Sequence, residues 1–319
     1  MSQEQSFISW VGHGAVSLPP RAEFKGVNAY AFLIEANLAS MQTLVDKLLT
    51  PATGQHVAYK VVGACCMVSF MAIEQCRSLV DQIGWEPGQE AAWWIPLWET
   101  DSRSKQTRMV FWSPYIFIDY QIGLITGREV WGWSKAMGQI EIELPQKAQP
   151  WSMNCQTTLF RTLNDNTRAE KGVLFEVQST GALTPLGELG TAQASELNAV
   201  LEKAFPDSAL SQLKTAWGLG SLSAVALKQS RDPANPQSCS YQAIVDSPLK
   251  IASPKVGISA AFPIDGTLTV RNFESHQIVE DFGLRALSKL SDSTTVQLLA
   301  CFGLQCDLTV ENGWVIVQA

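Results

Sequence analysis

Strand-like segments recur along almost the whole chain, and they limit its possible folds more than any other feature. Short runs rich in valine, isoleucine and aromatic residues, bounded by turn residues, are typical of strands. They lie at about 29–35, 56–76, 91–98, 107–117, 140–144, 151–163, 174–178, 222–229, 240–251, 266–272, 296–302 and 307–317. Helical patterns lie at 38–48, where Asn37 or Ser40 is the expected N-cap, and within 185–220. Many strands with few helices predict a β-rich barrel or sandwich with helices outside it.

Composition and charge exclude several classes of partner. The 319 residues carry a formal charge of -7, and 46% of them are hydrophobic. This acidic balance argues against nucleic acid and anionic membranes. No signal-peptide pattern opens the chain, and its longest uncharged apolar run, 61–73, is shorter than the about 20 residues that cross a bilayer. Seven scattered cysteines without C-x-x-C spacing suit a reducing compartment, so we expect a cytoplasmic protein.

The residue types that bind metals and nucleotides are present without the required patterns. The three histidines lie far apart in the sequence, at His13, His56 and His276. Cys301 and Cys306, if they share one strand, point to opposite faces. The glycines of 218–223 follow a helix and precede a strand, the reverse of a dinucleotide-binding loop. We expect neither a metal nor a cofactor.

One lysine has unusually apolar neighbours in the sequence. Lys135 follows Trp131 and Trp133 and precedes Met137, and in an extended segment these four side chains share one face. Such surroundings disfavour the charged ammonium, and a neutral amine can attack a carbonyl carbon to form a Schiff base. The alternative is a lysine whose stem packs on the tryptophans while its amine reaches water. Ser134 is not expected to pair with Lys135, since adjacent strand residues point opposite ways.

The stretch around this lysine also carries a motif. Gly127-Arg128-Glu129 is followed by Trp133-Ser134-Lys135-Ala136-Met137-Gly138. It resembles the signature of the acetoacetate decarboxylase family, G-R-E-x-x-x-[aromatic]-P-K-K-L-G, with Ser134 and Ala136 in place of the proline and the second lysine. Weaker likenesses extend the resemblance over most of the chain. It implies one domain over 1–319 with a helical insertion at about 185–220, folded as a mostly antiparallel, closed or nearly closed β-barrel or cone with peripheral helices.

The resemblance also implies a set of site residues. Lys135 matches the family's Schiff-base lysine, and Trp133 matches its pocket aromatic residue. The family's active-site glutamate can be aligned with this sequence in two ways. Matching the E-x-G-Q residues gives Glu86, whereas counting back without a gap from Ile95-Pro96 gives Glu90. Glu90 is slightly preferred. The other residues expected to line the pocket are Trp131, Arg128, Tyr30, Ser69 and Met71.

The departures from the family pattern bear on the chemistry. The family's pocket arginine falls at Asn28 or Tyr30, and its other glutamate falls at Ser69. An arginine suits a substrate carboxylate, so its absence weakens acetoacetate as the substrate. With Ala136 in place of the second cation, desolvation alone or another cation such as Arg128 must favour the neutral amine.

The activity implied by the resemblance is that of a Schiff-base-forming lyase. Decarboxylation of a β-keto acid through an iminium on Lys135 is the first expectation. The alternatives are an aldolase or dehydratase activity, or a non-catalytic protein that binds a hydrophobic ligand on the same fold. The expected partner is a small carbonyl compound, not nucleic acid or a membrane, and family relatives form homo-oligomers.

Overall fold

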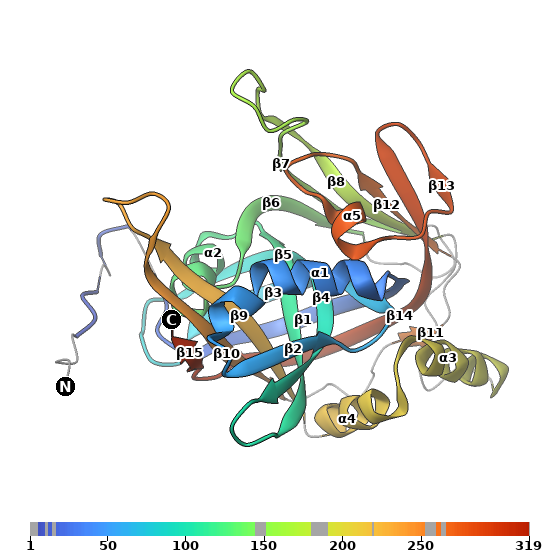
Figure 1. Cartoon of the computed structure of the whole chain (residues 1–319), viewed down its shortest axis with the longest axis horizontal. Helices are drawn as coiled ribbons and strands as arrows, with labels where there is room; N and C mark the ends of the chain where they lie inside the picture. The colour runs from blue at the N-terminus through green and yellow to red at the C-terminus, as the bar shows by residue number, and fades with distance from the viewer. Residues whose placement is uncertain are drawn as a thin grey trace.

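One continuous sheet dominates the computed structural model, which describes residues 6–9, 12–14, 17–143, 151–179, 191–218, 220–252, 260–262 and 266–318 (Figure 1). Its strands are β1 (Ala22–Glu35), β2 (Val57–Val61), β3 (Cys65–Ser78), β4 (Trp85–Asp101), β5 (Thr107–Ile118), β6 (Lys135–Ile142), β7 (Trp151–Leu159), β8 (Glu170–Ser179), β9 (Ser221–Arg231), β10 (Cys239–Ala252), β11 (Ala260–Phe262), β12 (Gly266–Arg271), β13 (Ser288–Lys289), β14 (Ser293–Val310) and β15 (Trp314–Gln318).

The strands nearly close into a ring. The main path of pairing is β15-β10-β9-β5-β6-β7-β8-β12-β14-β1-β3-β4-β2, and additional pairings join β10 to β14 and β5 to β4. Most pairs are antiparallel, as predicted. The sheet is nonetheless mixed, because β5 runs parallel to both β6 and β9. A parallel neighbour requires a crossover, and the chain makes one between β5 and β6 through two short helical turns.

Helices lie outside the sheet, as expected. Helix α1 (Leu38–Leu48) buries Met41, Leu44 and Val45, and Asn37 caps it by accepting a hydrogen bond from the Ser40 amide. In Figure 1, α3 (Thr191–Ala204) and α4 (Asp207–Gly218) lie together at the rim of the sheet, in the interval predicted to be helical. The remaining helical segments are η1 (Thr50–Thr53), α2 (Gln121–Thr126), the π-helical turn η2 (Gly127–Trp131) and α5 (Ile278–Phe282).

The central strands carry a different apolar cluster on each face. Phe70, Ala91 and Phe117 are cross-strand neighbours on β3, β4 and β5, and they belong to the larger cluster. Ala92 and Ile116, each one residue along, face the other way and belong to a second cluster. The two faces therefore bury separate sets of side chains, and the candidate site lies with the second set.

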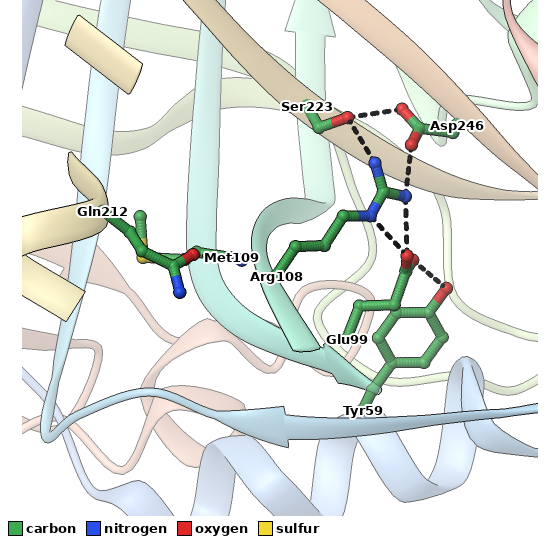
Figure 2. Close-up of polar contacts among 7 residues, drawn as sticks. All are labelled: Tyr59, Glu99, Arg108, Met109, Gln212, Ser223 and Asp246. Carbon is green, nitrogen blue, oxygen red and sulfur yellow. Dashed lines mark hydrogen bonds and ion pairs between the residues drawn. The ribbon is translucent and has the colours of Figure 1, made fainter. Parts of the chain in front are cut away.

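A polar network ties the strands together beside the parallel pairing. Arg108 of β5 donates hydrogen bonds to Glu99 of β4, to Asp246 of β10 and to Ser223 of β9 (Figure 2). The Tyr59 hydroxyl of β2 donates to Glu99 over 2.9 Å. Both carboxylates are buried, so Arg108 supplies the positive charge that makes their burial tolerable.

Three sequence expectations are corrected. The turn predicted at 84–89 is the start of β4, and the long strand predicted at 56–76 is divided into β2 and β3. The stretch 131–137, considered above as extended, begins at the end of a helical turn and is a strand only from Lys135 onward. All seven cysteines are unpaired. Among the described residues, no helix has the length and apolar character needed to span a bilayer.

Candidate active site

A buried ion pair marks the site. Lys135, the first residue of β6, is 2% exposed, and Glu90 of β4 is 5% exposed. Lys135 Nζ lies 2.6 Å from Oε2 of Glu90. The sheet register explains why Lys135 and Glu90 are close, because Lys135 lies beside Ile116, which pairs with Ala92. Glu90 is two residues from Ala92 on the same strand and shares its face.

The space for the lysine side chain comes from a glycine and a tryptophan. A Cβ at Gly127 would lie 2.6 Å from Lys135 Cδ and 2.7 Å from Cε, so the lysine stem passes directly over this residue. Lys135 Nζ lies 4.9 Å from the ring centre of Trp133, close enough for a cation–π interaction. Trp131 stacks on Trp133 with 5.6 Å between ring centres and 23° between planes. Met137 lies two residues further along β6 and is exposed, so it does not add to the apolar surroundings of the amine.

The chain before β6 is folded into a tight turn. The Trp133 amide donates to the Gly127 carbonyl over 2.9 Å, and Gly132 takes φ 78°, a left-handed conformation that favours glycine. Arg128 Nη1 donates to the backbone carbonyl of Lys135 over 2.7 Å. This contact orients the backbone of Lys135, and Arg128 is not placed as a second cation against the amine.

The residues beside the lysine point away from it. The Ser134 hydroxyl donates to the backbone carbonyls of Ser113 and Pro114, so a serine–lysine pair does not form. Ala136 lies beside Phe117 and packs against the larger core cluster, on the opposite face from the amine.

The two candidate glutamates have different surroundings. Glu90 contacts the lysine amine, as described above. Glu86 instead accepts hydrogen bonds from the amides of Gln121 and Ile122, at 3.3 Å and 2.8 Å, and so caps the N-terminus of α2. Of the two candidate glutamates, Glu90 is the one whose carboxylate contacts Lys135.

The other predicted pocket residues divide between the faces. Met71 pairs with Glu90 across β3 and β4 and shares its face. Ser69 lies on that face too, where its hydroxyl accepts a hydrogen bond from Trp94 Nε1 over 2.8 Å. Tyr30 does not belong to this site. It pairs with Phe70 and packs against the larger cluster, since it falls on the opposite parity of β1.

No protein-family model matches the sequence, and no curated protein matches it. Solved structures do match. Acetoacetate decarboxylase from Legionella pneumophila aligns with a TM-score of 0.59 at 11% identity, over 99% of this chain and 98% of that one. The chain has the acetoacetate decarboxylase fold.

Two further structures share the acetoacetate decarboxylase fold. An acetoacetate decarboxylase-like enzyme from Sphingomonas wittichii has a TM-score of 0.57 at 14% identity, over 95% of each chain. The enduracididine biosynthesis enzyme MppR, complexed with the condensation product of pyruvate and imidazole 4-carboxaldehyde, has a TM-score of 0.52 at 13% identity, over 97% of this chain and 94% of that one. The likeness is one of fold, which can carry different activities.

Within this acetoacetate decarboxylase fold, Tyr120 and Cys76 lie beside the ion pair, and sequence reasoning missed both. Burial raises the pKa of the Cys76 thiol to about 12, while Lys135 and the Tyr120 hydroxyl lower it. The pKa of Tyr120 is raised by its burial first, then by Cys76 and Glu90. Gly88 and Gly123 both make room for the Tyr120 ring, but this relation is visible only once the elements are placed in space.

Lys228 of β9 is a third residue that was not expected at the site. Its Nζ donates to the Val130 carbonyl over 3.2 Å and lies 5.5 Å from the ring centre of Tyr241. Burial lowers the pKa of Lys228, and the charge of Glu129 opposes that shift. Lys228 thereby holds the turn that carries the two tryptophans.

Proposed function

We propose that this protein is a Schiff-base-forming lyase that decarboxylates a small β-keto acid through an iminium on Lys135. The observation that carries the proposal is the buried contact of 2.6 Å between Lys135 Nζ and Glu90. A buried ion pair is seldom a gain in stability over apolar packing, because both charges lose their water. Its presence in an apolar wall therefore supports a chemical role.

The ion pair can generate the nucleophile. The ammonium of Lys135 gives a proton to Glu90, which leaves a neutral amine and a carboxylic acid. The amine attacks the substrate carbonyl carbon to form a carbinolamine. Glu90 then returns its proton to the departing hydroxyl group, so water leaves and an iminium cation faces the Glu90 carboxylate. Atoms and charge balance, and one carboxylate serves as base and then as acid.

The iminium then withdraws electrons from the substrate. When the β-carboxylate leaves as CO2, the electrons of the broken bond pass to the iminium nitrogen and give an enamine. A proton added to the enamine carbon restores the iminium, and water releases the ketone and the free lysine. The Trp133 ring, with Trp131 stacked on it, covers the nitrogen with apolar surface, which limits premature access of water.

A second candidate is an aldol-type condensation or dehydration on the same iminium. The MppR complex with a condensation product of pyruvate favours it, since that protein shares the fold. The alanine at position 136 bears on the choice too, because the second lysine of the decarboxylase pattern is absent here. A non-catalytic protein that binds a hydrophobic ligand is the remaining alternative.

The test compares CO2 release and condensation products from a panel of small keto acids and aldehydes. Lys135→Ala is expected to abolish turnover, and Glu90→Gln to lower it by about 10²–10⁴-fold, the usual range for a general acid–base group. Lys250→Ala, at a lysine whose side chain is 61% exposed, is the control and keeps full activity. Activity that survives in Lys135→Ala would rule out the proposal.

A further inference from the structure

The Tyr120 hydroxyl has an unusual position for a buried polar group. Tyr120 is buried, and its hydroxyl has no well-aligned hydrogen-bond partner among the described residues. Beyond the larger effect of burial, the neighbouring Cys76 thiol raises the pKa of Tyr120 by its charge and by a side-chain hydrogen bond, but sulfur is a weak acceptor and the contact falls short of a regular hydrogen bond. Leaving such a group without a partner costs stability, so each case in a folded protein calls for an explanation.

Two neighbouring backbone segments fix the position of the Tyr120 ring. A Cβ at Gly88 of β4, or at Gly123 of α2, would collide with the Tyr120 ring. Two separate segments therefore leave room for the ring and fix its plane. Tyr120 comes two residues after Ile118, which pairs with Glu90. On an extended strand end this spacing places the ring on the face that carries Glu90.

The Tyr120 hydroxyl interacts electrostatically with the surroundings of the Lys135–Glu90 ion pair. Glu90 raises the pKa of Tyr120 after the larger effect of burial, and Lys135 lowers the pKa of Cys76 beside it. The raised pKa keeps the phenol neutral across the physiological range, so the O–H remains a donor throughout. A donor that meets only a weakly accepting thiol among the described residues, close to the ion pair of Glu90 and Lys135, suits an oxygen that arrives with the substrate.

We propose that the Tyr120 hydroxyl donates a hydrogen bond to the carbonyl oxygen of the substrate bound at Lys135. This inference rests on the proposed function and adds a substrate contact to it. As the Lys135 amine attacks, negative charge develops on that oxygen, and a fixed donor stabilises it. No proton leaves Tyr120, because Glu90 handles the proton transfers. Tyr120 is thus a catalytic residue by hydrogen bonding alone.

The test replaces tyrosine by phenylalanine at one buried and one partly buried position. Tyr120→Phe removes the hydroxyl and keeps the ring. Tyr115→Phe is the matched control, because the Tyr115 hydroxyl donates to Asp281 over 2.5 Å and its ring packs with the larger cluster. Two quantities are measured: the rate of borohydride-trapped adduct formation with acetoacetate and pyruvate, and the affinity for 3-hydroxybutyrate by calorimetry.

Tyr120→Phe is expected to slow adduct formation by about 10²-fold, as for the loss of one oxyanion donor, and to weaken binding of the hydroxy acid. Its melting temperature is expected to stay close to that of the wild type, since only a contact with a weakly accepting thiol is lost. Tyr115→Phe lowers the melting temperature and keeps both the adduct rate and the affinity.

The remaining outcomes separate this inference from the proposed function. If Tyr120→Phe stays within twofold of the wild type in both measurements, or loses rate only in step with its melting temperature, the Tyr120 contact is wrong and the Schiff base stands. If the wild type forms no adduct but Tyr120→Phe weakens binding, the Schiff base is wrong and the contact stands. If the wild type neither reacts nor binds, both are wrong.

Discussion

The side chain of Lys135 fills space that exists because residue 127 is glycine. A methyl group there would lie 2.6 Å from Lys135 Cδ, well inside the contact distance of two carbon atoms. Gly127 has no left-handed backbone, so the need for glycine here is one of space rather than conformation. The position of the Lys135 amine relative to Glu90 therefore depends on residue 127 having no side chain.

Gly127→Ala is expected to displace the lysine and slow formation of the imine by about 10²-fold or more, since reacting groups tolerate little misplacement. The overpacking should also lower the free energy of unfolding by about 1–3 kcal/mol. Single-turnover trapping and urea denaturation measure the two effects. Gly172→Ala is the control, because a Cβ there meets its nearest neighbour at 3.5 Å. Equal trapping rates for the two variants would contradict the account.

The sequence indicated some side chains of the site better than others. Lys135 and Trp133 were predictable, because an apolar neighbourhood for a lysine shows in the residue types alone. Met137 keeps the parity of Lys135 on β6, but it is exposed and does not join the apolar surroundings of the amine. Tyr120 was missed because the isolation of its hydroxyl depends on β4, β5 and α2 meeting in space. Glu90 remained one of two alternatives until the strand register was known.

The helical crossover between β5 and β6 positions the lysine. Helix α2 and the turn η2 bring the chain from the end of β5 to the start of β6, beside β5. The start of β4 supports this crossover, because Glu86 accepts hydrogen bonds from the first amides of α2. The predicted turn at 84–89 was wrong for a physical reason. A register shift between β3 and β4 accommodates Pro87 within the strand.

Glu86→Ala is expected to lower the free energy of unfolding by about 1 kcal/mol, the usual effect of losing a helix cap. Its turnover per folded molecule should stay close to that of the wild type, because Glu86 makes no contact with the amine in the described structure. Glu202→Ala, at an exposed position of α3, is the control for stability. A loss of activity as large as that of Glu90→Gln would assign Glu86 to the chemistry instead.

The sheet as a whole depends on the network around Arg108. This residue joins two buried carboxylates at the place where β5 runs parallel to β9 (Figure 2). The strands of the sheet were largely predictable from their composition. Their order was not, because the parallel pairing of β5 with β9 joins segments more than a hundred residues apart, and no local pattern encodes such a contact.

Arg108→Met is expected to lower the free energy of unfolding by about 3 kcal/mol, because it leaves Glu99 and Asp246 as buried charges without a cation. This is the lower end of the usual range, since the arginine is partly exposed. Arg285→Met is the matched control. Its side chain is 82% exposed and 3.9 Å from Glu35, so the change should stay within about 0.5 kcal/mol. Urea denaturation that gave equal effects would contradict the role assigned to the network.

The most direct measurement of the central claim is mass spectrometry of the protein after incubation with acetoacetate or pyruvate and borohydride. The account predicts one added substrate fragment, carried by the peptide that contains Lys135 and missing in Lys135→Ala. It also predicts that Lys228, the other lysine near the turn, stays unmodified. An adduct on Lys228, or no adduct with any small carbonyl compound, would contradict the claim that Lys135 is the Schiff-base residue.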